Sequence, residues 1–319
     1  MASEFDLIQQ YFSRPAPDAI LGVGDDCALL QVAAGMQLAV STDTLVAETH
    51  FFPDADPVLL GWKSLAVNLS DLAAMGATPR WMTLAITLPE VDEAWLAAYA
   101  DGLYRCATQY QINLVGGDTT RGALSMTLTV MGEVPAGAAL RRDGARPGDT
   151  VWVSGSLGDA AFALAAIQGK LNLGDADAAT LSARLHAPEP RVALGQALLL
   201  VANSAIDISD GLLADLGHIL QRSQVGAVLD YISLPVSEIV HDLAAHPAFD
   251  RCVLAGGDDY ELCFTAPADK HTAIMAIGEK LGLRLTAIGQ ITAQTGLRLL
   301  DAEAQPVLLD FAGYDHFAS

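Results

Sequence analysis

Short apolar runs that end in small residues and aspartate recur along the chain. They occur at residues 38–40, 112–115 and 151–153, and they are followed by Ser-Thr-Asp-Thr, Gly-Gly-Asp and Ser-Gly-Ser-Leu-Gly-Asp. This pattern is typical of a buried strand that feeds a functional loop. It predicts three strands, each followed by a loop that carries an aspartate.

Longer segments between and around these runs have the pattern of helices. Residues 57–75 begin with proline, which suits a first helical turn, and residues 92–110 have acidic side chains in their first turn. Residues 159–168 and 211–222 are similar, and residues 1–12 have an apolar stripe that indicates a helix rather than a secretion signal. The mixture of strands and helices predicts an α/β or α+β fold.

One irregular segment divides the chain. A length of 319 residues favours two domains. Residues 132–150 are interrupted by glycine and proline and are richer in charge than their surroundings. We therefore predict an N-terminal domain at residues 1–147 and a C-terminal domain at residues 148–319.

The charge balance narrows the possible partners. The chain has 17 Lys and Arg residues against 38 Asp and Glu residues, which gives a net charge of −21. Such a chain would repel nucleic acid and anionic membrane surfaces. We expect no nucleic-acid partner and no membrane partner.

The cysteines and the apolar segments point to the cytoplasm. The four cysteines lie far apart and form no Cys-x-x-Cys pair, so no zinc or redox motif is present and reduced thiols are expected. The most apolar stretch, residues 192–202, is about half of the roughly 20 residues that span a bilayer. We therefore expect a cytoplasmic protein.

Aspartate beside small or hydroxyl residues is the main chemical feature of the sequence. Glycine lets the main chain approach a ligand closely, and Asp, Ser and Thr supply the hard oxygens that Mg²⁺ prefers. Any single segment of this kind could be an ordinary turn or helix cap. Six of them together indicate a metal site: residues 22–26, 41–44, 68–71, 116–120, 207–211 and 256–260.

These aspartates would need cations if they converged. Two carboxylates about 4 Å apart repel by roughly 4 kcal/mol at an effective dielectric constant of 20. Asp71 lies in a predicted helix on the same face as Asn68 and Met75, where it either points inward to a metal or belongs to a polar surface. Both interpretations of Asp71 stay open on spacing alone.

Phosphate binding would also depend on metal. Only four lysines occur, none in a glycine-rich loop, and the Walker and protein-kinase signatures are missing. Metal ions that bridge phosphate oxygens can support phosphoryl transfer. Arg121 and Arg142 are the cations best placed to contact phosphate. Arg142 could equally be a surface side chain, and for Arg121 the surface interpretation is slightly favoured. Residues 155–159 resemble a phosphate-binding turn only weakly, and a tight strand-to-helix connection, which needs the same glycines, is the favoured interpretation.

Taken in order, the six segments and residues 313–317 (Gly-Tyr-Asp-His-Phe) closely resemble the thiamine-monophosphate kinases. The resemblance covers nearly the whole chain. It implies the two-domain fold of the aminoimidazole-ribonucleotide-synthetase-like superfamily, with two α/β domains and a homodimer formed through the N-terminal sheet. It further implies the last step of thiamine diphosphate synthesis, in which ATP phosphorylates thiamine monophosphate with the help of several Mg²⁺ ions.

The resemblance also implies roles for particular residues. Substrate contacts would come from His50, Asp258 and Tyr314, and relatives more usually carry Glu at the position of Asp258. ATP contacts would come from Tyr104, Gly117, Asp118, Arg142 and Ser209. Metal ligands would be Asp26, Ser41, Thr42, Asp43, Asp71, Asp118, Asp207 and Asp210.

The expected reaction is direct in-line attack of the substrate phosphate on the γ-phosphate of ATP, because no residue stands out as a nucleophile or a base. Selenophosphate synthetase and the hydrogenase-maturation relative would each carry a terminal reactive cysteine, which this chain lacks. Three alternatives stay open. They are aminoimidazole ribonucleotide synthetase, a metal-dependent phosphatase and a nucleotide sensor without turnover.

Overall fold

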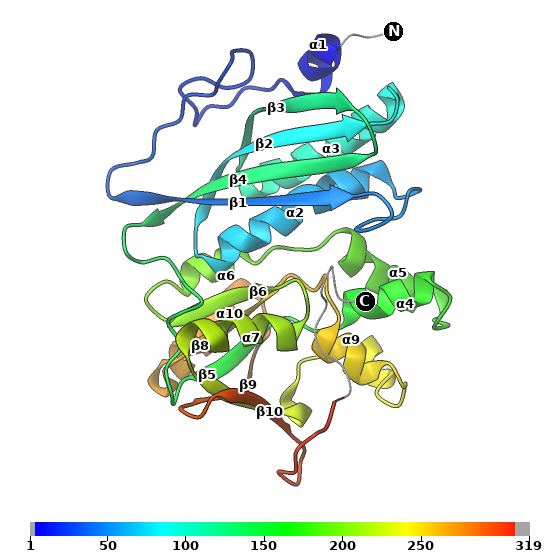
Figure 1. Cartoon of the computed structure of the whole chain (residues 1–319). Coiled ribbons are helices and arrows are strands. Elements are labelled where there is room, and N and C mark those ends of the chain that lie inside the picture. Colours follow the sequence, from blue (N-terminus) through cyan, green and yellow to red (C-terminus); the bar gives the residue numbers. More distant parts are fainter. Residues whose placement is uncertain (1–3, 310–319) are drawn as a thin grey trace. The chain divides into compact units, whose positions relative to one another are not determined.

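The chain divides into two compact units (Figure 1), seen in a computed structural model that describes residues 4–309. Unit 1 takes the described part of Met1–Leu72 together with Ala77–Gly137, and unit 2 takes Ala73–Gly76 and the described part of Ala138–Ser319. The main change of unit falls inside the irregular segment at residues 132–150. The predicted domain boundary between residues 147 and 148 stays a prediction.

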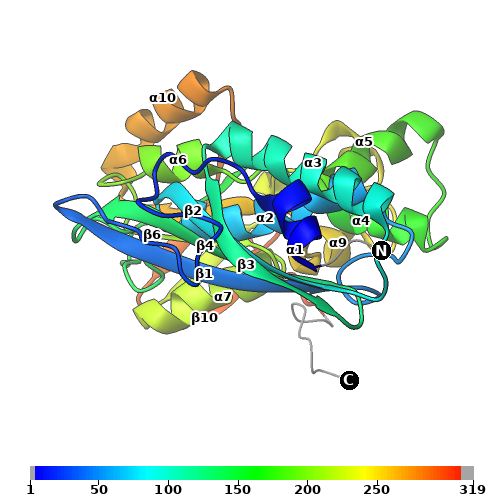
Figure 2. The same cartoon turned by 90° about the horizontal axis from the view of Figure 1, so that it is seen from above.

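Unit 1 is a four-stranded sheet with two long helices on one face (Figures 1 and 2). The strand order is β1-β4-β2-β3, in which β2 and β3 are parallel and the other neighbours are antiparallel. Its elements are α1 (Glu4–Leu7), the π-helical turn η1 (Ile8–Phe12), β1 (Met36–Val46), α2 (Pro57–Ala74), β2 (Thr78–Leu88), α3 (Glu93–Tyr110), β3 (Asn113–Arg121) and β4 (Ser125–Pro135).

Strand alternation decides which face of this sheet is covered. Met126, Leu128 and Val130 of β4 are fully buried, whereas Thr127 and Thr129 between them are only partly buried. Successive side chains of a strand point to opposite faces, so the buried set lies against the helices. The other face is polar and threonine-rich at its centre.

The two long helices form where the sequence predicts them. Asp92 caps α3, because its Oδ1 accepts hydrogen bonds from the amides of Ala94 and Trp95 at 2.9 and 3.0 Å. Glycine lets the helices pack closely: a Cβ on Gly102 would lie 1.8 Å from the carbonyl oxygen of Val58. The core of unit 1 therefore lies between α2, α3 and the sheet.

Two of the three predicted strand-to-loop boundaries are wrong. Residues 41–44 and 116–118 do not form loops but continue the strands β1 and β3. Polar side chains are tolerated there because β1 and β3 are the edge strands and one face of the sheet carries no helix. Hydroxyl pairs between strands, Thr42 with Thr129 and Thr44 with Thr127, both at 2.8 Å, stabilise the polar stretch of β1.

Unit 2 contains a six-stranded sheet in the order β10-β7-β9-β5-β8-β6, antiparallel except for the β10–β7 pair. Its strands are β5 (Thr150–Ser154), β6 (Ser204–Ile208), β7 (Gly226–Asp230), β8 (Glu261–Ala266), β9 (Leu285–Thr292) and β10 (Gly296–Leu300). Its helices are α4 (Asp159–Ile167), α5 (Asp175–His186), α6 (Val192–Ala197), α7 (Leu212–Ser223), α8 (Glu238–Asp242), α9 (Phe249–Ala255) and α10 (His271–Leu281), with 3-10 turns η2 (Tyr231–Ser233) and η3 (Ala268–Lys270).

Both faces of the unit 2 sheet are covered, with α7 and α10 on opposite sides (Figures 1 and 2). Val151 and Val153 of β5 belong to the main core with the apolar side of α7. Trp152 between them points to the other face, where its ring lies 5.0 Å from that of His271 at the start of α10. Across residues 4–309, no helix is both long enough and apolar enough to cross a membrane.

Candidate active site

The first group of site residues lies where β1 faces α2. The hydroxyl of Ser41 donates to a carboxylate oxygen of Asp71 at 2.5 Å, and the amide of Asp43 donates to the side-chain oxygen of Asn68 at 3.0 Å. Asn68 is itself buried and held by a bond from its Nδ2 to the carbonyl of Ser64 at 3.0 Å. Asp71 therefore points inward toward the strand, and it lies beside residues of the Ser-Thr-Asp segment.

The remaining predicted metal residues of unit 1 lie apart from this group. Thr42 points to the opposite face of β1 from Ser41 and Asp43, where its hydroxyl pairs with that of Thr129. Asp118 is on β3, at the other edge of the sheet from β1. Three inter-strand steps of about 4.8 Å separate these edges by roughly 14 Å.

Two further predicted residues are on loops at either side of β1. Asp26 is exposed in the Gly-Val-Gly-Asp-Asp segment, where its amide donates to Asp25 at 3.0 Å. His50 lies in the turn after β1, and its Nδ1 accepts a hydrogen bond from the amide of Val46 at 3.1 Å. An acceptor at Nδ1 places the proton of the neutral ring on Nε2.

Tyr104 on α3 is covered by a cation. The guanidinium carbon of Arg14 lies 3.5 Å from the centre of the Tyr104 ring. Burial raises the pKa of Tyr104 to about 12, and the charge of Arg14 opposes that shift. The Tyr104 hydroxyl is buried and has no hydrogen-bond partner among the described residues.

The second group of site residues lies at the end of β6 in unit 2. Asp207 is buried in β6, and Ser209 and Asp210 follow in the loop that leads to α7. The amides of Ser209 and Asp210 both donate to Oδ2 of Asp215, each at 3.0 Å. Burial raises the pKa of Asp215 to about 7, although these two hydrogen bonds lower it.

The Gly-Gly-Asp-Asp-Tyr segment lies beside this loop. The amide of Asp258 donates to the carbonyl of Ser209 at 3.0 Å, and the amide of Tyr260 donates to the carbonyl of Ile208 at 2.8 Å. Both Asp258 and Tyr260 have a positive φ, 68° and 49°, which is strained for residues other than glycine. The structure therefore brings the predicted substrate residue Asp258 next to the predicted ATP and metal residues of the β6 loop.

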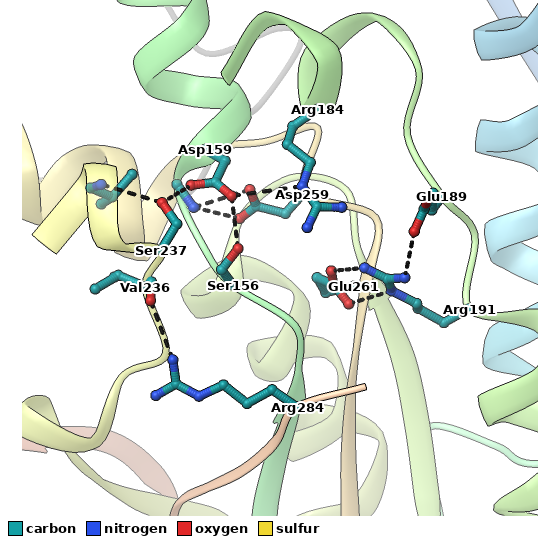
Figure 3. Close-up of polar contacts among 12 residues, drawn as sticks. Ser156, Asp159, Arg184, Glu189, Arg191, Val236, Ser237, Asp259, Glu261 and Arg284 are labelled. Carbon is teal, nitrogen blue, oxygen red and sulfur yellow. Dashed lines mark hydrogen bonds and ion pairs between the residues drawn. The ribbon is translucent and has the colours of Figure 1, made fainter. Parts of the chain in front are cut away.

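Sequence reasoning missed the role of Asp259. Its two carboxylate oxygens accept the amide of Gly158 at 3.0 and 3.1 Å, just before α4 (Figure 3). The acceptor at this helix start is thus a carboxyl group of the chain itself, which agrees with residues 155–159 as a tight structural connection. Burial, together with the charges of Asp159 and Glu261, raises the pKa of Asp259 well above its usual range. The doubled aspartate of the segment was the available signal.

A buried ion pair lies close to Asp259. Arg191 donates through Nε to Glu261 at 2.7 Å and through Nη2 to the other carboxylate oxygen (Figure 3). Glu261 also accepts the hydroxyl of Ser154 at 2.6 Å. Nothing in the spacing of Arg191 and Glu261, which are 70 residues apart, indicates this contact.

The two arginines predicted to contact phosphate are both exposed. Arg142 is exposed in the irregular segment after β4, and its carbonyl accepts the hydroxyl of Ser223 at 2.8 Å. Arg121 is exposed at the end of β3, where its Nε donates to the carbonyl of Pro89 at 3.2 Å. Tyr314 lies outside the described residues.

The donor chemistry of both groups fits Mg²⁺. Ser41, Asp43, Asp71, Asp207 and Asp210 offer only hard oxygens, without histidine or cysteine. Within residues 4–309, no three His, Cys, Asp or Glu side chains are already arranged to hold a metal ion. The predicted ligand set draws on residues of both units and stays a prediction.

Comparison with known protein families identifies the class of protein that has this fold and these two groups of oxygen donors. The family models for the N-terminal and C-terminal domains of AIR synthase related proteins match residues 24–134 and 146–302. The thiamine-monophosphate kinase of Escherichia coli strain K12 is 52% identical to this chain, over 99% of this chain and 98% of the relative. The chain belongs to the thiamine-monophosphate kinase family of AIR synthase related proteins.

Solved structures agree with this assignment. The thiamine-monophosphate kinase of Stenotrophomonas maltophilia K279a has a TM-score of 0.84 and 52% identity, over 89% of this chain and 91% of that chain. AaThiL complexed with AMPPCP and TMP has a TM-score of 0.79 and 28% identity, over 90% of this chain and 89% of that chain. The predicted two-domain fold and the predicted family are therefore confirmed.

Proposed function

We propose that this chain transfers the γ-phosphoryl group of ATP to thiamine monophosphate, which yields thiamine diphosphate. The observation that carries the proposal is the pair of oxygen-donor groups on a chain that matches thiamine-monophosphate kinases over almost its full length. The complex of AaThiL with AMPPCP and TMP supports the same pair of substrates.

The metal residues would hold several Mg²⁺ ions between the phosphates and the protein. Bound Mg²⁺ neutralises phosphate oxygens and charge that develops during transfer. The chain supplies the positions of the ligands: α2 holds Asp71 against Ser41, and Asn68 holds the main chain of Asp43. Because β1 alternates, Thr42 could reach the same side as Ser41 and Asp43 only through its main chain.

The reaction needs no nucleophile or base from the protein. A phosphate oxygen of thiamine monophosphate, already deprotonated near neutral pH, attacks the γ-phosphorus in line with the bond to the β–γ bridging oxygen. That bond breaks, and its electron pair leaves with ADP. The work of the chain is to bring the two reactants together and to exclude water.

The ATP would be held by Tyr104, Gly117, Asp118, Arg142 and Ser209, and the acceptor by His50, Asp258 and Tyr314. His50 suits a phosphate, since its Nε2 carries the proton when Nδ1 accepts from Val46. Asp258 is oriented by its neighbour, because the hydroxyl of Tyr260 donates to its Oδ1 at 2.9 Å.

We further propose a cytoplasmic homodimer formed through the uncovered face of the unit 1 sheet. Leu38 and Val40 on β1 are 43% and 57% exposed, which leaves apolar side chains available on that face.

The test is ATP turnover with Mg²⁺, with and without thiamine monophosphate, with products separated by chromatography. The wild type should form thiamine diphosphate, and Asp43→Asn should lose most of this product. Asp92→Asn is the matched control, since it removes the same charge at a helix cap where Asn serves as well as Asp. Phosphate release without an acceptor would indicate a phosphatase, and ATP binding without any turnover would indicate a sensor; either outcome would overturn the kinase proposal.

A further inference from the structure

The loop after β6 has its main chain held on both sides. The amides of Ser209 and Asp210 donate to a single oxygen of Asp215. The carbonyls of Ser209 and of Ile208, the last residue of β6, accept hydrogen bonds from the amides of Asp258 and Tyr260. Two successive amides that point to one spot form a small anion-binding concavity. In this chain the anion is Asp215, a side chain from the first turns of α7 that is only 3% exposed.

We propose that Asp215 is a positioning residue for nucleotide binding, which rests on the function proposed above. Asp215 binds Ser209 and Asp210 through their main-chain amides, so these two hydrogen bonds do not use the side chains that ATP and metal would need. Without it, the two amides would lose their shared acceptor and the loop could rotate. Asp215 thus acts through Ser209 and Asp210 rather than on the substrate.

The same helix also holds the other predicted phosphate contact of unit 2. Ser223, the last residue of α7, donates to the carbonyl of Arg142 at 2.8 Å and accepts the amide of Ala145 at 3.1 Å. Helix α7 therefore anchors Arg142 at its end and Ser209 and Asp210 at its beginning. This arrangement would hold the two nucleotide-binding segments at a fixed distance from one another, which is set by the length of α7.

The test compares Asp215→Asn with the wild type. The Asn side chain can place one oxygen where Oδ2 lies, but that oxygen carries no negative charge, so both hydrogen bonds would be weakened. We expect the KM for ATP and the half-saturating Mg²⁺ concentration to rise roughly 10- to 100-fold. The KM for thiamine monophosphate should change much less, which a general loss of folded enzyme would not produce. Asp215→Glu keeps the carboxylate and should recover part of the loss.

Asp149→Asn is the matched control. Asp149 is also 3% exposed and also accepts a backbone amide, that of Arg146 at 2.9 Å, but it belongs to no predicted contact. It should lower the unfolding midpoint without a change in the KM for ATP. An equal rise of this KM in both variants, or none in Asp215→Asn, would overturn the proposal.

Hydrogen exchange of the wild type gives a second measurement that does not depend on whether a variant folds. The amides of Ser209 and Asp210 should exchange slowly in the free protein, and exchange as fast as an open loop would overturn the proposal. If the wild type makes no thiamine diphosphate, the proposed function fails instead. The two failures are therefore distinguishable.

Discussion

Gly117 gives a direct test of the unit 1 sheet. It pairs with Leu84 on the parallel strand β2, and a Cβ at Gly117 would lie 1.8 Å from the carbonyl oxygen of Leu84. Real Cβ atoms do not come closer than 3.0 Å, so β3 would have to shift by about 1.2 Å. Gly117 also has a φ of 156°, which side chains disfavour. The loss of about two ladder hydrogen bonds and the added strain should cost about 3 kcal/mol.

The assay is urea unfolding of Gly117→Ala followed by tryptophan fluorescence. Three of the four tryptophans, Trp62, Trp81 and Trp95, are in unit 1, so the signal reports mainly on that unit. Gly116→Ala is the control, because its nearest neighbour would be a methyl of Thr83 at 3.9 Å. Gly116→Ala should lower the free energy of unfolding by less than about 1 kcal/mol. If the two variants unfold within about 0.5 kcal/mol of each other, the close approach of β3 to β2 is refuted.

Two further predictions concern the buried charges of unit 2. Since the pKa of Asp259 is raised, its neutral form contributes stability that is complete below pH about 4 and is lost as the pH rises through the raised pKa. Asp259→Asn cannot ionise, so its unfolding free energy relative to wild type should increase from pH 4 to pH 8, and a difference that is constant with pH would contradict this. Arg191→Ala leaves the carboxylate of Glu261 buried and unpaired and should lower the free energy of unfolding by about 3–5 kcal/mol. The double variant with Glu261→Gln should recover most of that loss, and no recovery would show that packing rather than charge is responsible.

The helices were the most predictable part of the fold. The start of α2 at Pro57 and the cap of α3 at Asp92 follow from local rules, and both were predicted within one or two residues. The polar parts of β1 and β3 were not predicted as strand. An edge strand with one uncovered face accepts polar side chains that otherwise indicate a loop. Whether a strand is at an edge depends on pairing with distant segments.

The oxygen-donor chemistry of the candidate site was predictable from the sequence, but the residues that hold its main chain in place were not. Asp43, Asp71, Ser209 and Asp258 stand out as oxygen donors beside glycine or hydroxyl residues. Asp215, a residue of an ordinary helical pattern, has no such signal, and the second aspartate at position 259 does not by itself indicate the contact with Gly158. Both side chains matter because they accept hydrogen bonds from main-chain amides, and these hydrogen bonds form only in the folded chain.

The sequence by itself determined the types of most elements, the family and the hard-oxygen character of the site, because periodicity and side-chain chemistry are local properties of the chain. Only the tertiary structure decided that Ser41 forms a hydrogen bond with Asp71 while Thr42 points to the other face of β1. It also decided that Asp259 accepts a hydrogen bond from Gly158, which lies 101 positions earlier in the chain. These choices depend on strand register and on which face a helix covers. A shift of one residue in either would leave the composition unchanged and separate the contacts.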